Sequence, residues 1–153
     1  MTPQFFDIHT HLHFEAFKND SREAASRALK EGVWMIQVGT QKDTSQQAIT
    51  LAESFKEGVY ATVGLHPIHT DVSFHDKKEF GGEGKSFTSR GEVFDYSYYK
   101  KLAERPKVVA IGECGLDYFR LDESSKELQK KVFIEHILLA NRLGKALMLH
   151  IRP

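Results

Sequence analysis

Two histidines near the start of the chain, His9 and His11, have the residue type and spacing of metal ligands. They lie at the end of an apolar run that predicts the first strand, and side chains two residues apart in a strand project to the same face. Two imidazoles on one face can bind a divalent cation. Asp7 lies on that face but deeper in the strand, where we expect it to support a ligand rather than to bind the ion. Solvated or hydrogen-bonded histidines without a metal are the structural alternative.

Three further polar residues each come at the end of a different predicted strand: His66, Glu113 and His150. Because the carboxyl ends of parallel strands form the functional face of α/β folds, we expect these residues to meet His9 and His11 at one rim. A carboxylate among several imidazoles suits zinc, manganese or magnesium. The sequence therefore predicts a divalent-metal centre at this rim.

Each of these residues also has an ordinary structural explanation. Glu113 could form an ion pair or cap a helix, His150 could be a core histidine, and His66 could shape the turn before Pro67. Because all of these residues are expected at one rim, we favour the metal centre. Within it, we expect His66 to contact substrate. The predicted ligands are His9, His11, Glu113 and His150.

Hydrophobic patterning predicts the elements that position these residues. Five apolar runs predict strands, at residues 5–9, 33–39, 59–63, 108–112 and 146–150. Helical spacing predicts helices between them: one over residues 21–31, and two that begin at capping-box patterns in residues 44–47 and 124–127. Gly32, Gly58 and Gly144 end the helices. Alternating strands and helices with short loops predict a parallel sheet covered by helices.

Composition indicates one globular domain over residues 1–153, with 41% hydrophobic residues and no net charge. Zero net charge argues against a general, salt-sensitive DNA binder, although a local pocket could still accept a nucleic acid. The single cysteine excludes an internal disulfide and suits a reducing compartment. Since no apolar run approaches the roughly 20 residues of a membrane span, and Phe5 and Phe6 are followed at once by Asp7, we expect a cytoplasmic protein without a signal peptide.

One region interrupts the strand–helix pattern. Residues 71–93 are rich in Gly, Ser, Lys and Glu and show little periodicity. We interpret them as a loop insertion after the third strand, either a lid that faces substrate or a solvated surface loop.

Several other residues receive structural predictions. We expect Trp34 and Cys114 to be core residues. Arg120 is expected at the surface. The remaining histidines have no evident partners and are also expected there: His13, His69, His75 and His136.

Four motifs together resemble the TatD family of metal-dependent hydrolases, which includes deoxyribonucleases and belongs to the amidohydrolase-like superfamily of TIM barrels. The motifs are Asp7-Ile8-His9-Thr10-His11-Leu12, Gly64-Leu65-His66-Pro67, Gly112-Glu113-Cys114-Gly115-Leu116-Asp117-Tyr118 and Leu149-His150-Ile151-Arg152. They occur in the order expected for the family, and the resemblance extends over the whole chain.

The resemblance implies a two-metal hydrolysis of phosphodiester bonds. His9 and His11 would bind one ion, Glu113 would bridge two ions as the catalytic carboxylate, and His150 would belong to the second ion. The phosphate of a DNA or other phosphodiester substrate would be oriented by side chains near the rim, namely His66, Tyr118 and Arg152.

Length is the main departure from the family. A TIM barrel has eight strands in about 250 residues, whereas this chain supplies five. A further His after the sixth strand and an Asp after the eighth, the expected general base, have no counterpart here. We therefore expect the N-terminal part of a TatD-like enzyme, incomplete as a catalyst.

Two alternatives stay open. The scaffold could serve an amidohydrolase that cleaves an amide, ester or lactone, because the rim ligands suit attack on carbon as well as on phosphorus. Alternatively, the chain could be a non-catalytic partial barrel that binds metal and pairs with another chain, or with itself, through its open sheet edges.

Overall fold

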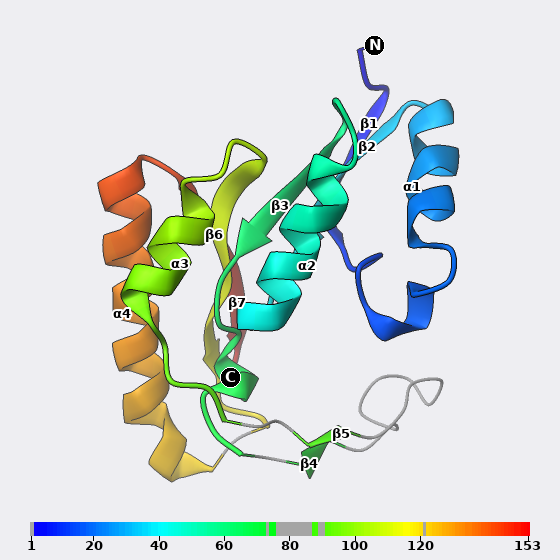
Figure 1. The fold of residues 1–153 in the computed structure, drawn as a ribbon. Helices are drawn as coiled ribbons and strands as arrows, with labels where there is room; N and C mark the ends of the chain where they lie inside the picture. The colour runs from blue at the N-terminus through cyan, green and yellow to red at the C-terminus, as the bar shows by residue number, and fades with distance from the viewer. Residues whose placement is uncertain (1, 73, 76–86, 89–90, 121) are drawn as a thin grey trace.

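The computed structural model describes residues 2–72, 74–75, 87–88, 91–120 and 122–153. Five parallel strands form one curved sheet in the order β1-β2-β3-β6-β7 (Figure 1). Their bounds are β1 Phe5–Thr10, β2 Val33–Val38, β3 Val59–Val63, β6 Val108–Asp117 and β7 Ala146–Arg152. The predicted partial TIM barrel is confirmed, and the largest difference is that β6 continues past residue 112 to Asp117.

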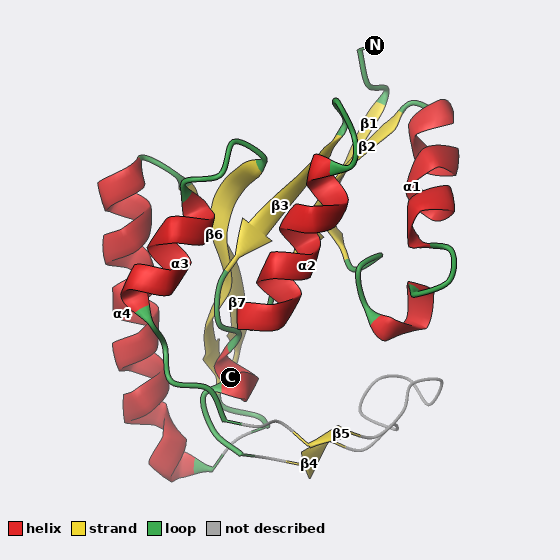
Figure 2. Ribbon diagram, in the orientation of Figure 1, coloured by secondary structure: helices red, strands yellow, loops and turns green. Residues whose placement is uncertain are grey.

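Helices connect successive strands and pack along the sheet (Figure 2). Their bounds are α1 Ser21–Lys30, α2 Lys42–Glu53, α3 Tyr96–Ala103 and α4 Lys126–Leu143. The described residues also include short 3₁₀ turns, η1 Glu15–Phe17, η2 Pro67–His69 and η4 Glu123–Ser125. The predicted end of α4 is confirmed, because Gly144 takes the left-handed conformation (φ 62°) that lets its amide bond back to the last turn.

The hydrophobic core lies between the sheet and its helices. Met35 of β2 and Val63 of β3 belong to one buried cluster with Ile49 of α2 and Leu139 of α4. Full burial of a side chain of this size stabilises the fold by roughly 1.5–3 kcal/mol. This packing fixes the strand ends relative to one another, and Figure 1 shows those ends at the same side of the molecule as the chain's C-terminus.

Both predicted capping boxes are wrong in position. At α2 the cap is Gln41, whose backbone N–H donates to the Thr44 hydroxyl (2.8 Å), so Thr44 occupies the third helical position instead of opening the helix. At α4 the preceding Ser125 makes no side-chain cap and donates instead to the Asp122 carbonyl (2.7 Å). Ser and Thr hydroxyls have several local partners, so the pattern locates a helix start only to within a turn.

The patterning did not predict α3. Its sequence, Tyr96 to Ala103, is rich in aromatic residues, which favour strands as readily as helices. Two contacts determine the helix: the Asp95 carboxylate accepts from the Tyr98 amide (3.0 Å), and Tyr99 is fully buried against Phe94, with parallel rings 4.8 Å apart. Tertiary packing therefore outweighs the weak local signal here.

Burial corrects several residue-level predictions. His69 and His136 are buried and not at the surface. Trp34 is only half-buried and contacts the ring of Phe6, so it is not a core residue. The core prediction for Cys114 is confirmed: it is fully buried, and burial raises the pKa of its thiol to about 12.

Two further surface predictions are corrected in part, because His13 and Arg120 are both half-buried. The fourth predicted surface histidine, His75, has a side chain outside the described residues.

Most of the predicted insertion at 71–93 lies outside the described residues. Within it, β4 Phe74–His75 pairs with β5 Phe87–Thr88 in antiparallel fashion. After this segment, the amide of Glu92 donates to the His69 carbonyl (2.8 Å). Among the described residues, none of the helices combines the length and the apolar character that crossing a bilayer requires.

Candidate metal centre

Glu113 lies at the middle of the candidate site, where it is 8% exposed. It belongs to β6, between β3 and β7 in the sheet, and histidines reach it from β1, from the turn after β3 and from β7. The chain is tightly packed just before it, because a Cβ added at Gly112 would lie 2.3 Å from the Met148 carbonyl oxygen of β7. Glycine at this position therefore lets the two strands approach closely beside the carboxylate.

One group of candidate ligands contains His9, His11 and Glu113. The ring centroids of the two histidines are 5.1 Å apart, although His11 lies one residue beyond the end of β1 at Thr10. His9 Nε2 is 3.3 Å from Glu113 Oε2, and one ligand atom of each member of the group lies within 4.8 Å of the others. These distances are compatible with three ligands of one cation.

A second group contains His66, Glu113 and His150. Here the other carboxylate oxygen is used: Glu113 Oε1 is 3.2 Å from His150 Nδ1 and 3.7 Å from His66 Nε2. The two imidazole rings lie against each other, with centroids 4.1 Å apart. Glu113 therefore presents one oxygen to each group of histidines.

Hydrogen bonds determine which ring nitrogens have a free lone pair. The Nδ1–H of His11 donates to the Val38 carbonyl (3.1 Å), which leaves Nε2 of His11 as an electron-pair donor. His150 lies between two carboxylates: Nε2–H donates to Asp117 Oδ2 (2.9 Å), and Nδ1 is 3.2 Å from Glu113 Oε1, where it donates while protonated and can bind a cation once that proton is lost. Metal-ligating histidines commonly make such a hydrogen bond through the nitrogen that does not bind the ion.

His66 has the opposite arrangement. The Ile68 amide donates to His66 Nδ1 (3.2 Å), so the proton of the neutral ring is on Nε2, the nitrogen that faces Glu113. Although the distances include His66 in a ligand group, this nitrogen lacks a free lone pair unless the bond to Ile68 breaks. The hydrogen bonding therefore makes His66 a donor toward the site.

The electrostatics favour the neutral form of two of these rings, His11 and His66. Burial, with help from His9, lowers the pKa of His11. Burial and the neighbouring His150 hold the pKa of His66 well below its usual range. The pKa of His150 is raised, chiefly by its hydrogen bond to Glu113. Neutral imidazoles are the form that binds metal, and a cation beside Glu113 would compete with the proton on His150.

Asp117 contacts the candidate ligand His150, and the sequence analysis gave it no role. Besides His150, it contacts the following turn, where the amides of Phe119 and Arg120 donate to its Oδ1 (3.2 and 2.9 Å). The Gln129 side chain from α4 bonds both its amide and its carbonyl (2.7 and 2.9 Å). A signal was available, because Asp117 and Glu113 have the same parity in one strand and so share a face.

The remaining predicted site residues, Asp7, Tyr118 and Arg152, contact residues other than the candidate ligand Glu113. Asp7 accepts from the His9 amide (3.1 Å) and so supports the end of β1. The Lys126 ammonium lies 4.6 Å from the Tyr118 ring centroid, and the Arg152 guanidinium 4.0 Å from that of Phe119. Since none of these contacts involves Glu113, the phosphate-binding roles of Tyr118 and Arg152 stay predictions.

The chain is thus a partial TIM barrel with candidate divalent-metal ligands toward the carboxyl ends of its strands. The family profile described as "TatD related DNase" matches residues 6–153. The chain therefore belongs to the TatD-related DNase family, as the sequence motifs predicted.

Individual relatives agree with this assignment. The chain is 34% identical over 148 residues to an "uncharacterized metal-dependent hydrolase YabD" of Bacillus subtilis. It is 35% identical over 148 residues to a "3'-5' ssDNA/RNA exonuclease TatD" of Erwinia tasmaniensis. Each alignment covers 96% of this chain and 50% of the relative. The chain thus spans about half the length of the curated relatives it matches.

A solved structure has the same fold. The TatD homologue YJJV from Escherichia coli K12 superposes with a TM-score of 0.73 at 30% sequence identity. The match covers 99% of this chain and 52% of that one. This chain therefore corresponds to about half of that longer chain.

Proposed function

We propose that this chain provides the Glu113-centred part of a two-metal site for hydrolysis of phosphodiester bonds in nucleic acid. The observation that carries the proposal is the position of Glu113, which directs one carboxylate oxygen at His9 and the other at His150. The names of the relatives, metal-dependent hydrolase and single-stranded DNA/RNA exonuclease, support the same class of reaction.

His9, His11, Glu113 and His150 would hold the cations, with zinc, manganese or magnesium as the candidates. Bound divalent ions would supply an activated water and neutralise negative charge on the phosphate. The protein's own contribution is orientation. Val38 fixes the ring of His11, Asp117 fixes that of His150, and Asp7 supports the backbone of His9.

We assign His66 to the substrate and not to the metal. Its Nε2 carries the ring proton because Nδ1 accepts from Ile68, and Nε2 faces the same carboxylate as the ligands. A neutral N–H donor at this place suits a phosphate oxygen. Tyr118 and Arg152 are proposed as further phosphate contacts.

We also propose a cytoplasmic location, with which the buried Cys114, free of any disulfide, is compatible.

The test of the metal site is the metal content of the purified chain after equilibration with Mn²⁺ or Zn²⁺. We expect about one ion or more per chain, and loss of this metal when His9→Ala and His11→Ala are combined. His13→Ala is the control, because His13 lies outside both ligand groups. Full metal retention by the double variant would show that the assignment of this pair is wrong.

The substrate class needs a separate comparison. Single-stranded DNA and RNA with free 3′ ends, a small phosphodiester, and a panel of esters, lactones and amides are assayed with the same metal-loaded protein. Metal-dependent cleavage of the phosphodiesters alone supports the proposal. Selective cleavage of esters or amides would instead support the amidohydrolase alternative.

A second candidate function is supported by the exposed apolar side chains on the outer strands. Phe5 and Ile8 of β1 are 67% and 63% exposed, and Leu149 and Ile151 of β7 are 53% and 60% exposed. β1 and β7 are the end strands of the five-stranded sheet. Such a surface suits a partial barrel that pairs with another chain or with a second copy. Sedimentation velocity across a range of concentrations distinguishes an associating chain from a monomer.

A further inference from the structure

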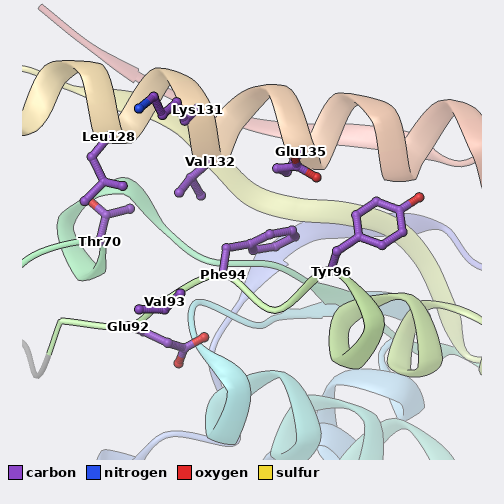
Figure 3. A pocket seen from close by; sticks show the side chains of 9 residues that line it. All are labelled: Thr70, Glu92, Val93, Phe94, Tyr96, Leu128, Lys131, Val132 and Glu135. Atoms are coloured by element: carbon purple, nitrogen blue, oxygen red, sulfur yellow. The ribbon is translucent and has the colours of Figure 1, made fainter.

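His136, on α4, is a fully buried histidine outside both groups of candidate ligands. Its ring lies against Phe94, with centroids 4.3 Å apart, and near Tyr99 at 6.2 Å. Phe94 also lines a pocket of about 400 Å³ that lies along α4, together with Val132 and Leu128 (Figure 3). The ring is therefore enclosed by apolar and aromatic groups, where an unsatisfied polar atom would be costly.

Both ring nitrogens of His136 nevertheless have a partner. Nδ1–H donates to the Val132 carbonyl one turn earlier in α4 (2.7 Å), and Nε2 accepts from the Leu65 amide (2.9 Å). Only a neutral imidazole with its proton on Nδ1 can make both bonds. Burial lowers the pKa of His136 to about 4, so this form persists at neutral pH.

The bond to Leu65 is one of three that hold the segment Gly64–His66. β3 ends at Val63, so the next amides lie beyond the regular strand and find separate partners. The Gly64 amide donates to the Ser45 hydroxyl (3.3 Å) and the His66 amide to the Thr40 carbonyl (2.9 Å). His136 supplies the acceptor between them and is the only one of the three acceptors that comes from α4.

The same segment is pressed against the residue that precedes Glu113. A Cβ added at Gly64 would be 2.7 Å from the Gly112 Cα, so the two backbones are in close contact. A displacement of Leu65 would therefore move His66 relative to Glu113. The hydrogen bond that the Leu65 amide donates to His136 acts on this geometry, although His136 contacts neither side chain.

We propose that His136 is a positioning residue that sets the distance and ring orientation of His66 relative to Glu113 through the Leu65 amide. The inference rests on the proposed function in one respect only, the assignment of His66 as a substrate contact. The geometric part concerns Leu65 and His66 alone, and can be measured on the metal-free protein.

Two substitutions separate positioning from core packing. His136→Phe keeps an aromatic ring but removes the acceptor, whereas the side-chain carbonyl of His136→Gln can still accept from Leu65. Phe94→Leu is the matched control, because it disturbs the same cluster and leaves the hydrogen bond in place.

Amide hydrogen exchange is the first measurement, with Leu65 compared with Val63 in the same protein to cancel any change in global stability. We expect His136→Phe to reduce the relative protection of Leu65 at least tenfold, and His136→Gln and Phe94→Leu to preserve it. Unchanged relative protection in His136→Phe would overturn the proposal.

The ring ¹⁵N chemical shifts of His66 are the second measurement. We expect His136→Phe to shift the His66 signals away from the neutral Nε2–H pattern, and His136→Gln to restore that pattern. If His66 is unchanged while Leu65 loses protection, His136 does not position His66. Neither measurement requires bound metal. If the chain binds no metal, the proposed function is wrong, and these two measurements still test the role of His136.

Discussion

Glu113 combines a negative charge with two separately directed oxygens, and both properties are needed to serve two groups of histidines. Glu113→Gln keeps the size of the side chain and removes the charge. We expect divalent-metal affinity to fall by about 100-fold or more, since a neutral amide is a poor ligand between cations. Calorimetric titration with Mn²⁺ measures the change. Glu127→Gln, on the exposed face of α4, is the control, and equal affinities of the two variants would contradict the central role of Glu113.

Asp117 acts on the site through His150. Asp117→Asn retains an oxygen for the amides of Phe119 and Arg120 but replaces the carboxylate that accepts from His150 Nε2. Loss of such a supporting carboxylate typically costs 10–100-fold in metal affinity. We expect a reduction within that range, together with unchanged thermal stability of the metal-free protein. An affinity equal to that of the unsubstituted chain would show that His150 needs no support from Asp117.

The buried ring of His136 is expected to make the free energy of unfolding depend on pH. Its folded-state pKa of about 4 is below the unfolded value of 6.5, so the unfolded chain binds more protons between these pH values. The stability contributed by the neutral ring is fully present above pH 6.5 and is lost as pH falls toward 4. At about 1.36 kcal/mol per pKa unit, the loss approaches about 3 kcal/mol.

Urea unfolding at several pH values tests this prediction. The free energy of unfolding of His136→Gln should fall less between pH 6.5 and pH 4 than that of the unsubstituted chain. Some dependence remains in the variant, because burial also lowers the pKa of His13 to about 4. Parallel curves for the two proteins would exclude His136 as a source of the acid sensitivity.

At the level of elements, Glu92 connects the beginning of α2 with α3. Its Oε2 accepts from the Lys42 amide in the first turn of α2 (3.1 Å), and its Oε1 accepts from the Tyr99 hydroxyl (2.6 Å). A carboxylate at a helix N-terminus is stabilised by the orphan amides and by the helix dipole. Glu92→Gln should therefore reduce the free energy of unfolding by about 1–2 kcal/mol.

Chemical denaturation of Glu92→Gln measures that loss. Glu104→Gln is the control, because the exposed pair of Glu104 with Lys100 should change stability by no more than about 0.5 kcal/mol. Similar stability changes in both variants would mean that the bonds of Glu92 are no stronger than a surface ion pair.

The sequence predicts an element well when local residue patterns determine it, and poorly when contacts with distant residues determine it. The five strands were predictable because each is a short apolar run beside a glycine or a polar strand end. α3 was not, because its helical state depends on Tyr99 reaching the core. The buried state of His136 was not predictable either, since its partner Leu65 is 71 residues away in the chain.

The candidate site was more accessible to prediction than the details around it. His9, His11, Glu113 and His150 could be brought together because all four lie in or just beyond the carboxyl-terminal half of parallel strands. The proton positions of His66 and His150 could not, because they depend on contacts with Ile68 and Asp117 that only the folded chain defines.

The exposed apolar side chains on the end strands predict that the folded chain associates with other chains. Ile151→Lys places a charge on the exposed face of β7 and should reduce any concentration-dependent association in sedimentation experiments. Val93→Lys is the matched control, because Val93 is 86% exposed but lies on the rim of the pocket beside α4. Equal reduction by both variants would mean that the contact is not at the sheet edge.

The glycines of β6 limit how this site can change during evolution. Cβ atoms added at Gly112 and Gly115 would lie 2.3 and 2.1 Å from carbonyl oxygens of β7, so even alanine cannot be accommodated without moving a strand. Substitutions at these two positions therefore cannot change the distance between the strands in small steps. Descendants that acquire a different metal preference should therefore do so by exchanging the side chains at positions 9, 11, 113 and 150, while the backbone around them stays the same.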